Sequence, residues 1–321
     1  MGDSVIRSVR VLVGSVALVG LLFPATAQAQ AACTWQRTEL PVPAGHGNPA
    51  VKGVGGEYTV AQTMATPTPG IARWHKGVPT LVGSPTQDPA FYGAPRDVSA
   101  NGTILAELVP TAGPPVGEPY VTLLDGTHKS LGTPAPGQQK VAVGINASGD
   151  VVGYTSIDGV QRLVLWSASD YSKPQILGAG DPVGIDDDGF ILAKPGIRYK
   201  PGVIAKPLKK PAGATQIQVH GYDNNTAAGL AVIGDTFYAT VWNADGSVRF
   251  VLTAGKGQSA NSQGSVLNGG PIHKLWRAGQ AADLPVPGPA NHTQAFVTER
   301  DTIVGNYRDD LDGYAAEWTC S

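Results

Sequence analysis

The chain has 321 residues, a net charge of −2 at pH 7 and only 15% charged side chains. This charge balance excludes the basic face that a nucleic-acid-binding protein needs, and the hydrophobic content of 42% exceeds that of a disordered chain. The 42 glycines and 26 prolines are typical of a turn-rich, all-β protein.

The first predicted element is a secretory signal peptide over residues 1–29. Arg7 and Arg10 precede the apolar run Val11–Phe23, and Ala27-Gln28-Ala29 has the small-residue pattern of a cleavage site. The apolar run is shorter than the about 20 residues that a membrane-spanning helix needs. We therefore expect export, a mature chain that begins near Gln30, and no membrane attachment after the signal is removed.

The rest of the chain consists of short apolar runs between turn residues, most clearly in the stretch Val141–Gly178. This stretch contains four such runs, each bounded by Gly, Asn, Asp, Ser or Pro: Val141–Ile145, Val151–Tyr154, Leu163–Trp166 and Gln175–Leu177. Four strands with tight connections form an antiparallel meander, which is the blade of a β-propeller.

The same pattern recurs along the chain in seven approximate units of about 42 residues, a usual length for four-stranded propeller repeats. The units are Val51–Gly83, Arg96–Gly132, Val141–Gly178, Pro182–Leu208, Val219–Leu252, Ser259–Gly288 and Gln294–Cys320. The last unit has three strands, and Thr34–Pro43 matches its missing fourth strand. The sequence predicts one seven-bladed β-propeller over about residues 33–320, closed by the N-terminal strand. Six blades are the alternative, because the unit Pro182–Leu208 is eroded.

One large residue at the end of each third strand supports this register. The equivalent positions are Trp74, Leu124, Trp166, Tyr199, Trp242, Trp276 and Trp318. Core packing between successive blades explains why an aromatic residue recurs once per unit, whereas a sugar-binding platform would not repeat at one register. We also expect almost no helix, because no window after the signal peptide has helical hydrophobic periodicity.

The stretch Val141–Gly178 resembles the HAF repeats of secreted bacterial proteins. Their unit runs Ile-Asn-x-x-Gly-x-Val-Val-Gly, followed by a His-Ala-Phe-like strand that ends in Trp. The segment Ile145–Gly153 matches the first part, and Leu163-Val164-Leu165 stands in place of the triplet. The similarity is partial over Gln294–Trp318 and faint elsewhere. The resemblance implies an exported, propeller-like repeat protein and brings no catalytic residues with it.

The loops at the rim of the seventh blade hold the first group of candidate site residues. His46 and His292 lie in predicted blade-to-blade loops, and Asp309, Asp310 and Asp312 lie between the second and third strands. Two histidines with carboxylates could bind a transition metal or perform acid–base chemistry. No compact ligand spacing is present, so we favour solvated loop residues and expect neither a metal nor a cofactor.

A second group shares one register in the first strands, where side chains would face the central channel. Its members are Arg96, Val143, Val183, His220 and Gln258. The polar residues could bind an anionic or sugar ligand, or they could simply contact channel water.

The run Asp186-Asp187-Asp188-Gly189 superficially resembles a calcium-binding loop. It lacks the spaced oxygen ligands of an EF-hand loop and aligns with the turn Asn146–Gly149 of the next unit upstream. We therefore interpret it as a hairpin turn.

The only two cysteines, Cys33 and Cys320, lie near the ends of the mature chain. They occupy the position of the hairpin turn that would join the third and fourth strands of the seventh blade. Antiparallel neighbours there come within disulfide reach, and an exported chain permits the bond. The sequence predicts that a Cys33–Cys320 disulfide completes the ring.

For function, the sequence favours a secreted non-catalytic propeller, a monomer that serves as a binding or scaffold module for an extracellular protein or glycan. The alternative is a secreted hydrolase or lyase that acts on polysaccharide, with His46, His220, His292 and Arg96 as candidate catalytic residues. No Gly-x-Ser-x-Gly, His-Glu-x-x-His or phosphate-binding motif supports a specific reaction.

Overall fold

The structure is a computed structural model that describes residues 34–65, 69–113, 117–269, 274–277, 280–283, 295–309 and 312–320. The predicted signal peptide, Cys33, His292 and Asp310 lie outside these residues. Every regular element within the described ranges is a β-strand, as the sequence predicts. None of these residues forms a helix of the length and hydropathy that membrane crossing requires.

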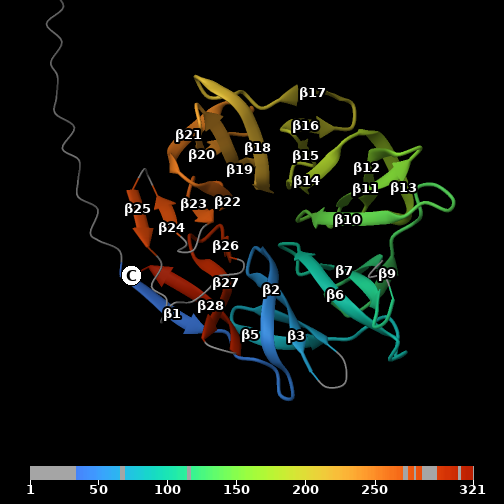
Figure 1. Ribbon diagram of the computed structural model, residues 1–321. Helices are drawn as coiled ribbons and strands as arrows, with labels where there is room; N and C mark the ends of the chain where they lie inside the picture. Colours follow the sequence, from blue (N-terminus) through green and yellow to red (C-terminus); the bar gives the residue numbers. More distant parts are fainter. Residues whose placement is uncertain are drawn as a thin grey trace, which may run out of the picture. The chain divides into compact units, whose positions relative to one another are not determined.

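The strands form seven antiparallel sheets of four strands each, arranged in a ring around a common centre (Figure 1). Blade 1 contains β2 (Gly47–Gly55), β3 (Tyr58–Met64), β4 (Gly70–His75) and β5 (Val78–Val82). Blade 2 contains β6 (Phe91–Val98), β7 (Ile104–Pro110), β8 (Glu118–Thr122) and β9 (His128–Ser130). Blade 3 contains β10 (Lys140–Ile145), β11 (Val151–Ile157), β12 (Val160–Ser167) and β13 (Asp170–Ala179). The first strand of each blade lies nearest the centre.

The remaining blades repeat this order. Blade 4 contains β14 (Asp181–Ile185), β15 (Ile191–Lys194), β16 (Ile197–Lys200) and β17 (Val203–Pro207). Blade 5 contains β18 (Ala214–Asp223), β19 (Thr226–Ile233), β20 (Thr236–Trp242) and β21 (Val248–Ala254). Blade 6 contains β22 (Lys256–Ala260), β23 (Val266–Gly269), β24 (Lys274–Arg277) and β25 (Gln280–Asp283). Blade 7 contains β26 (Ala295–Val297), β27 (Ile303–Asp309), β28 (Asp312–Cys320) and, as its outer strand, β1 (Trp35–Glu39). The seven-bladed β-propeller is confirmed, and the six-bladed alternative is wrong.

The ring closes where the two ends of the described chain meet in blade 7. Strand β1 pairs antiparallel with β28, and its register runs from Trp35 opposite Cys320 to Glu39 opposite Ala316. The prediction that the N-terminal strand supplies the missing fourth strand is therefore confirmed. Cys33 lies outside the described residues, so the disulfide stays a prediction.

The repeated tryptophans pack between blades, as predicted. Trp74, Trp166, Trp242 and Trp318 are at most 1% exposed. Three of their indole N–H groups donate hydrogen bonds of 2.8 Å to carbonyls at the end of the preceding blade, those of Pro41, Gly132 and Lys209. Each of these carbonyls follows a buried leucine, so the indole both fills the interface and ties it to the neighbouring backbone.

The assignment of Leu124 to this series is wrong. Ile104 pairs with Thr122 in blade 2, in the same register as Val151 with Trp166 in blade 3. Thr122 is fully buried and takes the position, whereas Leu124 is 52% exposed in the turn that follows β8. The third strand of blade 2 ends two residues earlier than its apolar run indicates, because the run continues into the turn.

The acidic run in blade 4 is a turn between β14 and β15, which confirms that interpretation. The Gly189 N–H donates to the carbonyl of Asp186, and the Asp186 N–H donates to the carbonyl of Phe190, both at 2.9 Å. Gly189 has a φ of 79°, a left-handed conformation that glycine adopts without steric cost.

Candidate ligand site in the central channel

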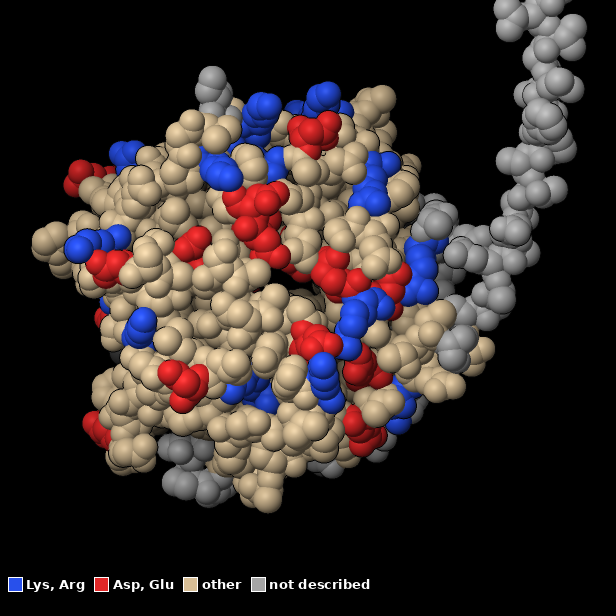
Figure 2. All heavy atoms as spheres, turned by 180° about the vertical axis from the view of Figure 1, so that it is seen from behind, with Lys and Arg blue, Asp and Glu red and all other residues tan. Residues whose placement is uncertain are grey.

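The innermost strands of all seven blades surround a central cavity of about 310 Å³. On the face seen in Figure 2, the cavity opens at the centre of the ring. Because each blade contributes its first strand, the side chains that line the cavity come from positions spread over most of the chain.

Six of the seven innermost strands carry a β-bulge at the same place. Each bulge leaves one extra residue without a partner in the pairing to the second strand, and that residue lines the cavity. These residues, which we call the bulge layer, are Lys52, Arg96, Val143, Val183, His220 and Gln258. A bulge bends its strand and redirects one side chain, and bulges are frequent beside functional sites.

The bulge layer confirms that the five residues predicted to face the channel do line it. Lys52 was missed, although Lys52-Gly53-Val54 aligns with Val143-Gly144-Ile145 in the clearest repeat. That alignment was the signal that could have identified it.

A glycine on the second strand lies beside the bulge in blades 3 and 5. Gly153 pairs with Ala142 and Gly229 pairs with Val219, each directly before the bulge residue. A Cβ atom on either glycine would overlap a backbone carbonyl of the bulged strand. In these two blades the glycine leaves room for the bulged backbone, whereas the other blades form the same bulge opposite Ala61, Ala106, Ala193 and Asn268.

The chemistry of the bulge layer differs around the ring. Lys52 and Arg96 come from neighbouring blades 1 and 2, Val143 and Val183 from blades 3 and 4, and His220 and Gln258 from blades 5 and 6. The channel wall is thus basic at blades 1 and 2, apolar at blades 3 and 4, and polar but uncharged at blades 5 and 6.

Arg96 is the only bulge residue among those described that forms an ion pair. Its Nη2 atom lies 2.6 Å from Oε2 of Glu107, which is buried, while the Arg96 side chain remains 52% exposed. The pKa of His220 is lowered by burial and, to a smaller extent, by the positive charges of Lys256 and Lys194. The imidazole is therefore neutral at pH 7.

Four carboxyl groups lie beyond the bulge layer, towards the turns that join the first and second strands. We call Asp97, Asp187, Asp223 and Glu299 the carboxyl group ring. The first three line the cavity, and Glu299 lies close enough to raise the pKa of Asp223. Figure 2 shows acidic side chains gathered around the central opening.

Asp97 occupies a position where four other blades have glycine: Gly53, Gly144, Gly184 and Gly221. Its carboxyl group accepts hydrogen bonds from the N–H of Val98 at 2.8 Å and from the N–H of Ile145, in the next blade, at 3.3 Å. Burial raises the pKa of Asp97 to about 7. A comparison of the repeats identifies Asp97 as an exception, because the equivalent glycines of other blades lie close to the neighbouring strand.

The pKa of Asp223 is also raised to about 7, first by burial and then by the negative charges of Glu299, Asp97 and Asp187. Two of the four carboxyl groups therefore change charge near neutral pH. None of the four was predicted as a channel residue, and Asp187 was considered only within the run Asp186–Gly189, which was interpreted as a turn.

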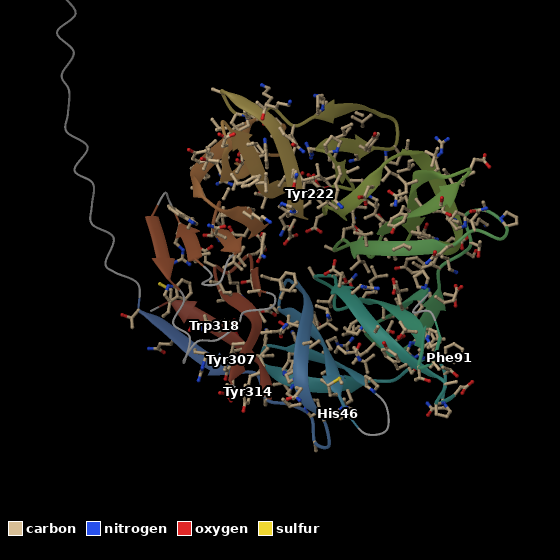
Figure 3. The ribbon with its side chains drawn as sticks, viewed as in Figure 1. His46, Phe91, Tyr222, Tyr307, Tyr314 and Trp318 are labelled. Atoms are coloured by element: carbon tan, nitrogen blue, oxygen red, sulfur yellow. The ribbon has the colours of Figure 1, made fainter. Side chains whose placement is uncertain are left out.

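Tyr222, Asp186 and Arg198 form a buried network between blades 4 and 5, and Tyr222 lies beside the centre of the ring (Figure 3). The Tyr222 hydroxyl donates a short hydrogen bond to Asp186, the Arg198 Nε donates to the Tyr222 oxygen at 3.0 Å, and Arg198 Nη2 lies 3.4 Å from Asp186. Burial and the nearby Asp186 charge raise the pKa of Tyr222. These groups satisfy one another, so the network joins the two blades.

The rim candidates do not converge on the channel within the described part of the chain. His46 lies at the periphery of blade 1 (Figure 3), where its Nδ1 atom is 2.9 Å from the Thr63 hydroxyl oxygen. His292 and Asp310 lie outside the described residues, as do the side chains of Asp309 and Asp312, whose backbones pair at the end of the β27–β28 hairpin. Among the described side chains, no group of three could hold a metal ion.

Comparisons with known proteins place the fold and nothing more specific. No protein-family model matches the chain, and no curated protein matches it. Among solved structures it is similar to a streptogramin B lyase, with 10% identity, a TM-score of 0.55 and coverage of 89% of this chain and 98% of that one. A catalytically inactive virginiamycin B lyase from Staphylococcus aureus with quinupristin gives 13% identity, a TM-score of 0.57 and coverages of 89% and 99%.

A prolyl endopeptidase is also similar, with 11% identity and a TM-score of 0.58 over 85% of this chain and 50% of that one. At such identities, similarity demonstrates a shared propeller architecture and carries no information on activity.

Proposed function

We propose that the protein is a secreted, non-catalytic binding module whose ligand occupies the central channel. The observation that carries this proposal is the bulge layer. The backbone geometry is the same in six blades, but the side chain that it turns into the cavity is Lys, Arg, Val, His or Gln. A conserved shape with a varied lining suits recognition of one particular ligand, because a purely structural bulge would need no such variety.

The secreted part of the proposal rests on the predicted signal peptide at residues 1–29. The resemblance of Val141–Gly178 to the HAF repeats of exported bacterial proteins supports the same location. In that setting the partner is an extracellular protein or glycan, and a Cys33–Cys320 disulfide would close the ring. Strand β1 brings Trp35, two residues after Cys33, opposite Cys320, so the two cysteines belong to neighbouring strand ends.

The second candidate is a secreted hydrolase or lyase that acts on polysaccharide. One observation favours it: Asp97 and Asp223 line the channel with pKa values of about 7, which suits a general acid or base at neutral pH. Against it, the Asp97 carboxyl group already accepts two backbone hydrogen bonds.

A channel-filling variant tests the proposal. Val143→Trp places a large side chain in the cavity, and Val160→Trp is its matched control on the exposed part of the same blade. A glycan array and a screen of extracellular proteins with the mature chain should give a ligand that Val143→Trp loses and Val160→Trp keeps. Retention by both variants would exclude the channel as the site. Release of oligosaccharides from a polysaccharide would favour the enzymatic candidate instead.

A further inference from the structure

The basic side of the bulge layer has binding capacity that the fold does not use. Lys52 lines the cavity and forms no ion pair with any described residue. Arg96 contacts Glu107 through Nη2, and its side chain is about half exposed, so other guanidinium N–H groups can reach a ligand. Two cations on adjacent strands at one level of a channel attract an anionic group.

The opposite side of the layer supplies neutral hydrogen-bond donors. His220 is neutral at pH 7, and neither it nor Gln258 has a hydrogen-bond partner among the described residues. Val143 and Val183 form an apolar wall between this pair and Arg96. A carboxylate accepts about four hydrogen bonds in one plane, and its carbon framework can lie against an apolar wall.

The carboxyl group ring limits how much negative charge the ligand can carry. Asp223 follows His220 by three residues along β18, a distance of about 10 Å in a strand. Asp187 and Glu299 belong to the same ring. A second negative charge within about 10 Å of the first would therefore meet like charges in a confined space.

We infer that the bulge layer binds a carboxylate group on a ligand that carries no second negative charge close to it. Lys52 and Arg96 bind the carboxylate oxygens, His220 and Gln258 donate further hydrogen bonds, and the carboxyl group ring excludes polyanions. This inference rests on the proposed function and adds the chemical class of the ligand.

Calorimetric titration of the mature protein with matched small probes tests the inference. D-glucuronate and glucose share a sugar ring and differ in the carboxylate, N-acetylglycine offers the carboxylate without a sugar, and citrate is a polyanion. Glucuronate should bind at least about tenfold more tightly than glucose and citrate, as expected for hydrogen bonds to a charged group. Binding of N-acetylglycine would show that the carboxylate alone suffices, and its absence would assign the ligand to acidic sugars. Equal binding of glucuronate and glucose would overturn the inference.

Charge variants assign the effect to the bulge layer. Lys52→Gln should weaken glucuronate binding about tenfold or more, because it removes a charged donor that has no structural partner. Val143→Asp should abolish binding by placing a negative charge at the same level. Lys129→Gln, on the exposed outer strand β9, is the control and should leave the affinity unchanged. Unchanged affinity in both Lys52→Gln and Val143→Asp would overturn the inference.

Failure of the inference differs from failure of the proposed function. Suppose that Val143→Trp abolishes binding of a ligand whose affinity does not depend on a carboxylate or on Lys52. The channel then remains the binding site and only the ligand class is wrong. If Val143→Trp affects no ligand, both proposals are wrong.

Discussion

Replacement of Asp97 by asparagine should change how the stability of the protein depends on pH. The folded-state pKa of Asp97 is about 7, against an ordinary value of 3.8. Between these values the folded protein holds a proton on Asp97 that the unfolded chain has released. Stability must therefore fall as pH rises from about 4 to about 7, and then level off. The pKa difference corresponds to roughly 4 kcal/mol over that range.

Asp97→Asn removes this titration and also one hydrogen-bond acceptor. The Asp97 carboxyl group uses both oxygens, one for each backbone N–H, whereas asparagine has a single oxygen. An N–H group left without an acceptor costs about 1–3 kcal/mol. The variant should therefore be less stable than the parent at pH 5 and more stable at pH 8, so that the two stability curves cross.

Urea unfolding at half-unit steps between pH 4.5 and 8.5 measures both curves. Asp223 titrates in the same window, and its pKa is raised in part by the Asp97 charge, so the difference between the curves reports the titration of Asp97 together with its coupling to Asp223. Asp170→Asn is the control: this exposed carboxyl group has a pKa lowered to about 2 by hydrogen bonds from Ser172 and Lys173, so its contribution is lost only below the window. Parallel curves for parent and Asp97→Asn would refute the burial argument.

Three further substitutions test the architecture, two of them against a second variant of the same type. Trp166→Phe should lower the free energy of unfolding in urea by about 2 kcal/mol, because it removes the hydrogen bond to the Gly132 carbonyl and leaves a cavity. Trp276→Phe should lower it less, since the Trp276 indole N–H has no partner among the described residues. Gly153→Ala should lower stability by about 2 kcal/mol, because its Cβ atom would overlap the Val141 carbonyl, whereas Gly178→Ala, with open space around it, should not. Equal melting temperatures would refute the steric role of Gly153. Cys33→Ser should destabilise the protein by up to about 5 kcal/mol, and a missing Cys33–Cys320 peptide in non-reducing mapping would disprove the closure.

The architecture could be predicted from sequence because its signals are local. A blade needs four apolar runs and the turn residues between them, and all of these lie within about 42 residues. Closure was also predictable, since β1 resembles the outer strand of another unit. The predicted register was wrong at Leu124, because an apolar residue in a turn has the same sequence signal as an apolar residue at the end of a strand.

The channel site was predictable only in part. Arg96 and His220 follow from the repeat register, because the same position recurs in each first strand. The carboxyl group ring could not be predicted in this way, since its members occupy three different positions of the repeat in blades 2, 4, 5 and 7. They become neighbours only when the ring closes. His46 has the residue type of a site but lies at the periphery, because a blade-to-blade loop can end far from the channel.

The bulge and the glycine opposite it connect the repeat sequence to the proposed function. Each bulge adds one residue to the inner strand without lengthening the second strand, so the blade keeps its pairing on both sides. The extra residue makes no ladder contact, and its side chain can change without disturbing the core. Blades 3 and 4 place valine there, and blades 1, 2, 5 and 6 place polar residues. Asp97 differs because it sits one residue further along, where the strands of neighbouring blades approach closely. Except at Arg96, which pairs with the buried Glu107, changes in the bulge layer should therefore alter ligand preference at little cost in stability, whereas a change at Asp97 should alter stability itself.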